Sequence, residues 1–288
     1  MKLNPNARRS LRRAAVLLTA LLSLLPLAAA EPSATGNCAA REARPVKSAL
    51  SVEADSAASP DGGALWSEGA VAWTDADGAS ETLRYLLRAP AGAAEAEGLP
   101  LIVYLHGGSA KGDDLSLLIE GDGFPRYLAD GRLGDVPAYV VMPQLSRQAR
   151  GWAEAVGALS ALLDQLCAEL AIDPNAVCLT GHSMGGTGCW AVAAAMPERF
   201  CCAVPLSGSI RISPENVAAL SSLPVWAFVG DADEIEDPNA SIRFVEALHA
   251  AGGDARVTVI PGADHFAVPQ AYLNAGWDVV GWMLARAR

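Results

Sequence analysis

Positive charge is scarce in this chain. It contains 21 Lys and Arg residues against 32 Asp and Glu residues, which gives a formal net charge of −11 at pH 7. Five of the basic residues lie within residues 1–30, a segment without acids, so the rest of the chain has 16 basic and 32 acidic residues and a net charge of −16. A surface this acidic repels phosphate groups, which argues against nucleic acid and anionic membranes as partners.

Histidine is also scarce, and the cysteines follow no metal-binding spacing. The chain has four His and six Cys, and these residues do not recur in the pairs that are typical of zinc sites. The sequence therefore gives no indication of a zinc site. In an oxidising compartment disulfides are plausible, but sequence alone does not choose among Cys38, Cys167, Cys178, Cys189, Cys201 and Cys202. For Cys178 and Cys189 the pattern favours small, buried apolar side chains.

Residues 1–30 have the pattern of a secretory signal peptide. A basic start precedes an apolar run from Ala14 to Ala30, and Ala28-Ala29-Ala30 supplies a small-residue cleavage site. The alternative is an uncleaved membrane anchor, but the run is only marginally long for a span of about 20 residues. We therefore expect export to the periplasm or the medium after cleavage near Ala30, without stable membrane association afterwards. The Arg8-Arg9 pair leaves the general and the twin-arginine routes both open.

The rest of the chain is predicted to form one domain behind a linker. Residues 31–63 are rich in Ala, Ser, Pro and charge without periodicity, which indicates a linker or loose N-terminal arm. Residues 64–288 are enough for one catalytic domain with a sizeable core and too few for two.

Short apolar strands alternate with helices along residues 64–288. Strands at Trp66–Trp73 and Glu81–Arg88 flank a turn at Asp75–Gly78 and are expected to form an antiparallel edge. The continuous apolar run Leu99–Leu105 predicts a strand buried on both faces. Further strands are expected at 138–142, 201–206, 225–229 and 256–260, and helices at 124–129, 153–170, 214–220, 239–251 and 268–287. This alternation predicts an α/β fold with a mostly parallel, doubly wound sheet and little or no lid.

The stretch Ala176–Met196 gives the strongest chemical signal. An apolar strand, preceded by Asp173-Pro174-Asn175 as its boundary, turns through Gly181-His182-Ser183-Met184-Gly185 into an Ala-rich helix. Strand, Gly-x-Ser-x-Gly and helix are typical of a nucleophile elbow, in which Ser183 would occupy a strained turn with its hydroxyl exposed. Glycine fits on both sides because the backbone in so sharp a turn passes too closely for side chains. The pentapeptide also occurs by chance in glycine-rich chains, but its flanking strand and helix favour the catalytic interpretation.

The four histidines allow a base to be chosen by elimination. A serine hydroxyl needs a base within hydrogen-bond reach to act as a nucleophile. His106 belongs to a His-Gly-Gly turn, His182 adjoins the serine with its side chain expected to point elsewhere, and His249 lies on the surface of a helix. His265 follows the last strand, where the order serine, acid, histidine places the base. We therefore predict His265 as the general base.

The third member of such a triad fixes the tautomer of the histidine. The loop after strand 225–229 offers several acids in Gly230-Asp231-Ala232-Asp233-Glu234-Ile235-Glu236-Asp237. Most of them are expected to be solvated. We predict Asp233 as the triad acid and keep Asp231 as the alternative.

Acyl transfer also needs hydrogen-bond donors for the developing oxyanion. The backbone amide of Met184 is predicted as one donor, because it follows the nucleophile at a helix N-terminus. The His106-Gly107-Gly108 loop is expected to supply the other, from Gly108. Trp152 and Phe266 are either borders of the substrate pocket or core residues, and the sequence leaves both possibilities open.

With these residues in place, the chain resembles the α/β-hydrolase superfamily. Within it, the chain is similar to compact secreted esterases of the predicted-peptidase, feruloyl-esterase and polyhydroxybutyrate-depolymerase type. The resemblance covers about Glu81–Ala287 and rests on L-H-G-G-S-A-K-G-D-D, I-D-P-N-A-V-C-L-T-G-H-S-M-G-G-T-G-C-W and F-C-C-A-V-P-L-S-G, together with the Asp233 and His265 loops.

The resemblance implies hydrolysis of small or polymer-attached carboxylic esters through an acyl-enzyme, without metal or cofactor. Two alternatives remain open. One is a serine peptidase with the same triad, and the other is an exported binding protein that keeps the fold without activity. The sequence decides neither the natural substrate nor the oligomeric state.

Overall fold

The computed structural model describes residues 64–74, 80–121 and 123–287, all of which belong to one compact unit of the chain. The predicted signal peptide and N-terminal arm lie outside these residues, as does the whole turn expected at Asp75–Gly78. None of the helices in the described part combines the length and the apolar character that crossing a membrane would take.

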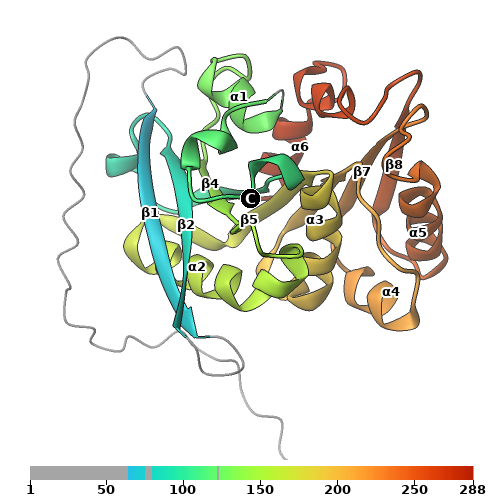
Figure 1. Ribbon diagram of the computed structural model, residues 1–288, viewed down its shortest axis with the longest axis horizontal. Coiled ribbons are helices and arrows are strands. Elements are labelled where there is room, and N and C mark those ends of the chain that lie inside the picture. The colour runs from blue at the N-terminus through green and yellow to red at the C-terminus, as the bar shows by residue number, and fades with distance from the viewer. Residues whose placement is uncertain (1–63, 75–79, 122, 288) are drawn as a thin grey trace, which may run out of the picture. The chain divides into compact units, whose positions relative to one another are not determined.

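One eight-stranded sheet runs through the described residues, in the order β1-β2-β4-β3-β5-β6-β7-β8 (Figure 1). The β1–β2 and β2–β4 pairs are antiparallel and all other neighbours are parallel, so the predicted antiparallel edge and parallel body are confirmed. The strands are β1 (Leu65–Thr74), β2 (Ser80–Ala89), β3 (Leu99–Leu105), β4 (Tyr139–Gln144), β5 (Ile172–His182), β6 (Cys202–Leu206), β7 (Val225–Gly230) and β8 (Ala255–Ile260).

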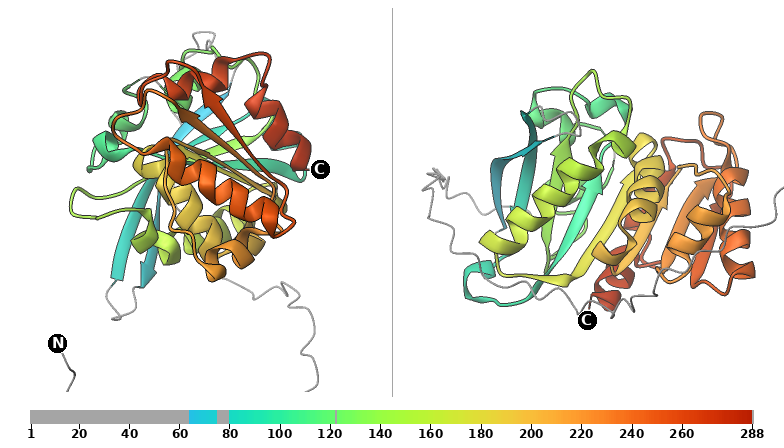
Figure 2. Two further views of the ribbon diagram at one scale, coloured as in Figure 1. Left: turned by 90° about the vertical axis from the view of Figure 1, so that its right-hand side faces the viewer. Right: turned by 90° about the horizontal axis from the view of Figure 1, so that it is seen from below.

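Helices cover both faces of the sheet (Figures 1 and 2). One face carries α2 (Val156–Glu169), α3 (Met184–Ala195), α4 (Pro214–Leu220) and α5 (Pro238–Ala250). The other carries α1 (Phe124–Ala129), the 3-10 helix η7 (Val268–Leu273) and α6 (Val279–Arg286). Shorter 3-10 turns are η2 (Ala93–Glu95), η3 (Gly108–Ala110), η4 (Leu115–Leu118), η5 (Trp152–Ala155) and η6 (Pro197–Arg199).

The alternation of side chains along β3 divides the interior into two cores. Leu101, Val103 and Leu105 pack in the core beneath α2, α3 and α5. The intervening Ile102 and Tyr104 pack in the core beneath α1 and α6. Successive strand residues point to opposite faces, so a strand between two helical layers needs apolar side chains at every position. The continuous apolar run predicted this placement correctly.

The prediction of one continuous closing helix over 268–287 is wrong in its middle. The structure has η7 over Val268–Leu273, a break, and then α6 over Val279–Arg286. At the break the Asn274 side chain accepts hydrogen bonds from the amides of Gly276 and Trp277, which replaces helical bonds. Asp278 has φ +44° and its side chain accepts from the amide of Gly281, so it caps the start of α6. Local side-chain bonds of Asn and Asp compete with helix continuation.

Two other boundaries also differ from the predictions. The helix expected from Ala153 begins as the 3-10 turn η5, and α2 proper starts at Val156. Asp173-Pro174-Asn175, expected to lie before the strand, is part of β5. There the pairing with β3 jumps from Leu99–Ile172 to Leu101–Val177, so these residues form a bulge instead of a terminating turn.

Candidate active site

Ser183 lies at the turn between β5 and α3. Its φ is +60°, a left-handed conformation that non-glycine residues rarely adopt. The strained elbow that the sequence predicted is therefore present. This conformation takes the chain directly from the buried strand β5 into the helix α3. It places the serine hydroxyl at the carboxyl edge of the parallel sheet.

Glycines around the elbow are required by backbone contacts. A Cβ at Gly185 would overlap the carbonyl oxygen of Leu105 on β3, and a Cβ at Gly186 would overlap that of Leu206 on β6. At Gly181 a Cβ would lie 2.5 Å from the Leu105 oxygen, a separation that Cβ atoms essentially never show. The first turn of α3 can therefore approach β3 and β6 only because these positions lack side chains.

The side chains of Ser183, His265 and Asp233 form one chain of hydrogen bonds. The Oγ atom of Ser183 lies 2.8 Å from Nε2 of His265. On the other side of the ring, Nδ1 lies 2.9 Å from Oδ2 and 3.1 Å from Oδ1 of Asp233. With its hydrogen on Nδ1, the ring donates to Asp233 and accepts from the serine hydroxyl, which is the arrangement a general base needs.

Asp233 is held as a carboxylate beside His265. Its side chain is 1% exposed and that of His265 is 4% exposed. Burial raises the pKa of Asp233, but the hydrogen bonds that it accepts from the backbone of Glu236 and from the His265 ring outweigh burial, so that the pKa is lowered overall. Asp231, the alternative acid, instead accepts from the amide of Gly262 at 2.6 Å and stands at the surface.

His182 contributes to the site in a way that the sequence did not indicate. Its side chain was expected to point elsewhere, but its Nε2 donates to the backbone carbonyl of His265 at 2.8 Å. The two rings lie 4.7 Å apart between centroids. Burial and the neighbouring His265 lower the pKa of His182 to about 4. A neutral His182 therefore fixes the loop that carries the base.

The predicted oxyanion loop lies against the nucleophile. An ideal Cβ at Gly107 would be 3.6 Å from the Cβ of Ser183, and η3 starts at the next residue, Gly108. Met184 begins α3 directly after the serine. The structure therefore brings both residues that carry the proposed donor amides, Gly108 and Met184, to the elbow.

His106 anchors this loop from inside the protein. Its Nδ1 donates to the carbonyl of Gly107 at 2.6 Å, and its Nε2 accepts from the amide of Leu145 at 3.0 Å. Burial lowers the pKa of His106 to about 4. The Leu145 bond uses the lone pair that a proton would need, so the neutral ring is the form that fits this site.

The structure separates the two aromatic residues predicted as pocket borders or core. Trp152 is a core residue: it is 1% exposed, its ring packs against Gly188, and its Nε1 donates to the carbonyl of His106 at 3.0 Å. Phe266 is 69% exposed and its ring lies 5.4 Å from that of His265. Of the two residues, only Phe266 is exposed beside the candidate base.

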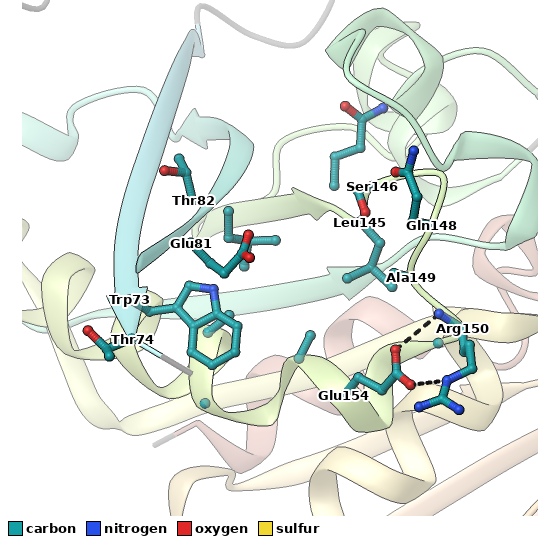
Figure 3. Close-up of a pocket in the computed structure, with 16 residues that line it drawn as sticks. Trp73, Thr74, Glu81, Thr82, Leu145, Ser146, Gln148, Ala149, Arg150 and Glu154 are labelled. Carbon is teal, nitrogen blue, oxygen red and sulfur yellow. Dashed lines mark hydrogen bonds and ion pairs between the residues drawn. The ribbon is translucent and has the colours of Figure 1, made fainter. Parts of the chain in front are cut away.

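A large open cavity lies at the β1–β2 edge of the sheet, and none of Ser183, Asp233 and His265 lines it (Figure 3). It has a volume of about 1020 Å³ and is formed by β1, β2, the segment after β4 and the start of α2. Figure 3 shows the indole of Trp73 on one side and the paired Arg150 and Glu154 on the other. Its wall includes Leu145, whose amide holds His106. A smaller cavity of about 90 Å³ is lined by His106, Gly107 and His182.

Cys178, Cys189, Cys201 and Cys202 are free thiols. Cys178 and Cys189 are fully buried, as predicted for small apolar side chains. Cys38 lies outside the described residues.

Comparisons with known proteins agree with this geometry. Residues 138–276 match the Dienelactone hydrolase family. NocK of Nocardia uniformis subsp. tsuyamanensis, a proposed esterase, is 28% identical over 171 residues, which cover 54% of this chain and 47% of that protein. The chain thus spans about half the length of this relative.

Solved esterase structures share the fold. A thermostable esterase superposes with a TM-score of 0.64 at 24% identity over 76% of this chain and 62% of that one. A ferulic acid esterase gives 0.56 at 16% identity over 77% and 99% of the two chains. At these identities the structural likeness concerns the fold alone. The chain therefore has the α/β-hydrolase fold, and over residues 138–276 it matches the Dienelactone hydrolase family.

Proposed function

We propose that this protein hydrolyses carboxylic esters through an acyl-enzyme formed on Ser183. The observation that carries the proposal is the unbroken contact from Ser183 Oγ through the His265 ring to the Asp233 carboxylate, at 2.8 and 2.9 Å. Each contact is short enough for a proton to be shared or moved. The match to the Dienelactone hydrolase family supports the same reaction class.

In the proposed first step, Ser183 Oγ attacks the ester carbonyl carbon while Nε2 of His265 takes the hydroxyl proton. Asp233 holds the Nδ1 hydrogen and stabilises the imidazolium that forms. The imidazolium then protonates the leaving alcohol as the acyl–oxygen bond breaks. In the second step the neutral His265 takes a proton from water as the water oxygen attacks the acyl carbon. The bond between the acyl carbon and Ser183 Oγ then breaks, the imidazolium returns its proton to Oγ, and the carboxylic acid leaves.

The amides of Gly108 and Met184 would stabilise the negative oxygen of both tetrahedral intermediates. Loss of one such donor costs roughly 10² to 10³ in rate. The bonds of His106 to Gly107 and Leu145 support this role, because they fix the loop before the substrate arrives.

An ester substrate is favoured over a peptide because the Dienelactone hydrolase match concerns ester hydrolysis and NocK is a proposed esterase. A serine peptidase remains the second candidate, since the same contacts would also serve an amide.

We further propose that the chain is exported and cleaved near Ala30. The support is the pattern of residues 1–30, with a basic start, an apolar run and a small-residue site. N-terminal sequencing of the protein recovered outside the cytoplasm tests this, and a mature protein that still starts at Met1 would contradict it.

Active-site labelling tests the catalytic proposal. A fluorophosphonate probe should label the wild-type protein and leave Ser183→Ala unlabelled, because the probe needs an activated serine. Ser109→Ala is the matched control, since Ser109 is an exposed serine of the adjacent loop, and it should still react. Labelling that persists in Ser183→Ala would refute the proposal.

A substrate panel then separates ester from amide chemistry. Acetyl, butyryl and feruloyl esters and small peptides are assayed with the wild-type protein and with Ser183→Ala. Turnover of esters that disappears in the variant is expected. Turnover of peptides alone would favour the peptidase.

A further inference from the structure

Three cysteine sulfurs meet beneath α6, away from the candidate active site. Cys178 lies in β5 opposite Cys202 in β6, and Cys201 directly precedes that strand. The Sγ atoms of Cys178 and Cys201 are 3.5 Å apart, and all three sulfurs lie within 4.8 Å of one another. Cys178 and Cys201 are 23 residues apart in the sequence, so the cluster is not evident there. The pairing of β5 with β6 brings the three residues together.

The cluster is nearly enclosed. Cys178 and Cys202 are fully buried. Cys201 is half-buried and is the member of the cluster that faces solvent. The thiol of Cys178 also lies 3.5 Å from the carbonyl oxygen of Met283 in α6. A buried cysteine usually packs as a small apolar side chain, and such packing does not require three thiols to lie in contact with one another.

The spacing of the sulfurs suits one metal ion. A metal–sulfur distance of about 2.3 Å places the sulfurs of a shared ion roughly 3.8 to 4.0 Å apart. The three thiols already lie near that separation, so small side-chain rotations would suffice. Within the described residues no His, Asp, Glu or further Cys joins the group. Three sulfurs without a nitrogen or oxygen side-chain ligand select a soft ion.

We propose that Cys178, Cys201 and Cys202 form a binding site for a soft, thiophilic metal ion, with Cu(I) as the ion that fits best. Cu(I) accepts three sulfur ligands, whereas structural zinc sites take four. On binding, the ion replaces thiol protons, which pass to water, and no electron is transferred. The thiol of Cys201 gives up its hydrogen bond to the carbonyl of Val177 in this exchange.

The three thiols of the cluster differ in how readily they lose a proton. Hydrogen bonds from the Cys178 and Cys202 thiols lower the pKa of Cys201, which favours its thiolate. The thiol contacts and burial raise the pKa of Cys178, so this proton leaves only when the ion replaces it. The hydrogen bond with Cys178 lowers the pKa of Cys202, but its contact with Cys201 and its burial outweigh this, so that the pKa is raised overall and this proton too leaves only when the ion replaces it.

The site is independent of the proposed ester chemistry. Cys178 precedes Ser183 by five residues on the extended strand β5, a separation of about 16 Å. Its occupation can therefore be tested without an activity assay.

The test titrates the reduced, anaerobic full-length protein with Cu(I) against the chromophoric chelator bicinchoninate. We expect one equivalent of Cu(I) to be withdrawn from the chelator and Cys201, the partly exposed thiol of the cluster, to become protected from the thiol reagent DTNB. X-ray absorption should show three sulfur neighbours. Cys201→Ser should weaken Cu(I) binding by more than roughly tenfold. That is the loss expected when a residue that only hydrogen-bonds a metal ligand is removed, whereas this variant removes a ligand itself.

Matched controls keep the test decisive. Cys189→Ala removes another buried thiol outside the cluster, and Cys38→Ser removes the cysteine outside the described residues, so both should bind Cu(I) like the wild type. Because Cys201 is half-buried, its variant should fold, which circular dichroism checks; Cys202→Ala provides a second ligand deletion. Failure of the reduced protein to bind Cu(I), unchanged affinity in Cys201→Ser, or a site with two sulfur neighbours would overturn the proposal.

Discussion

Nε2 of His182 lies 2.8 Å from the backbone carbonyl oxygen of His265. The residue immediately before the candidate nucleophile thus holds the loop that carries the candidate base. β5 and the loop after β8 are far apart in sequence, and this bond joins them directly beside the reacting atoms. It makes His182 a positioning residue.

Removal of this bond should slow catalysis without weakening substrate binding. His182→Phe keeps a ring of similar size but loses the donor, and we expect kcat to fall by about 10- to 100-fold because a small displacement of a reacting group is costly. KM should change little. His182→Gln retains an N–H donor and should recover part of the loss. Steady-state kinetics of the two variants measure this; equal rates for His182→Phe and the wild type would show that the bond positions nothing.

The two acids of the loop after β7 should behave differently. Asp233→Asn leaves the shape of the site intact but favours the wrong tautomer of His265, and kcat should drop by about 10⁴. Asp231→Asn should keep near-normal kcat, because that carboxylate bonds only the Gly262 amide among the described residues. Ester hydrolysis by the two purified variants provides the comparison. A severe loss in Asp231→Asn with normal activity in Asp233→Asn would reverse the assignment.

Stability should decline in mild acid because of buried neutral histidines. The pKa values of His106 and His182 are each lowered from 6.5 to about 4. Between these values the unfolded chain binds protons that the folded protein excludes, so the free energy of unfolding falls as pH drops from 6.5 to about 4. For the fully buried His106 the loss is at most about 3 kcal/mol.

Urea unfolding at several pH values measures this slope. His106→Gln should be less stable at pH 7 and should lose about half of the pH dependence, since His182 still titrates. A slope unchanged by the substitution would mean that other groups cause it.

Substitution of a glycine in the elbow should lower stability more than substitution of Gly108 in the neighbouring loop. Gly185→Ala places a methyl group on the carbonyl oxygen of Leu105, where backbone must move, so we expect destabilisation of about 3 kcal/mol or more. Gly108→Ala is the control for stability, because nothing lies within 4 Å of its Cβ. Thermal unfolding of both variants decides the matter: a Gly185→Ala protein as stable as Gly108→Ala would show that the close approach is not required.

Much of the architecture was predictable because it depends on neighbours in sequence. The apolar run Leu99–Leu105 predicted a strand buried on both faces, and the Gly-x-Ser-x-Gly pattern between strand and helix predicted a strained turn at Ser183; both are confirmed. The break before α6 was missed because Asn274 and Asp278 form side-chain bonds to nearby amides that an apolar pattern does not reveal.

The sequence by itself determined the strands, most helices and the elbow, since hydrophobic burial and backbone strain act over a few adjacent residues. Only the tertiary structure decided that Asp233 and not Asp231 reaches His265, that His182 points into the site, and that Cys178 meets Cys201 and Cys202. The physical reason is that these contacts cross between strands. Their partners depend on strand order and register, which are fixed by the packing of the whole sheet and are not encoded at any one position.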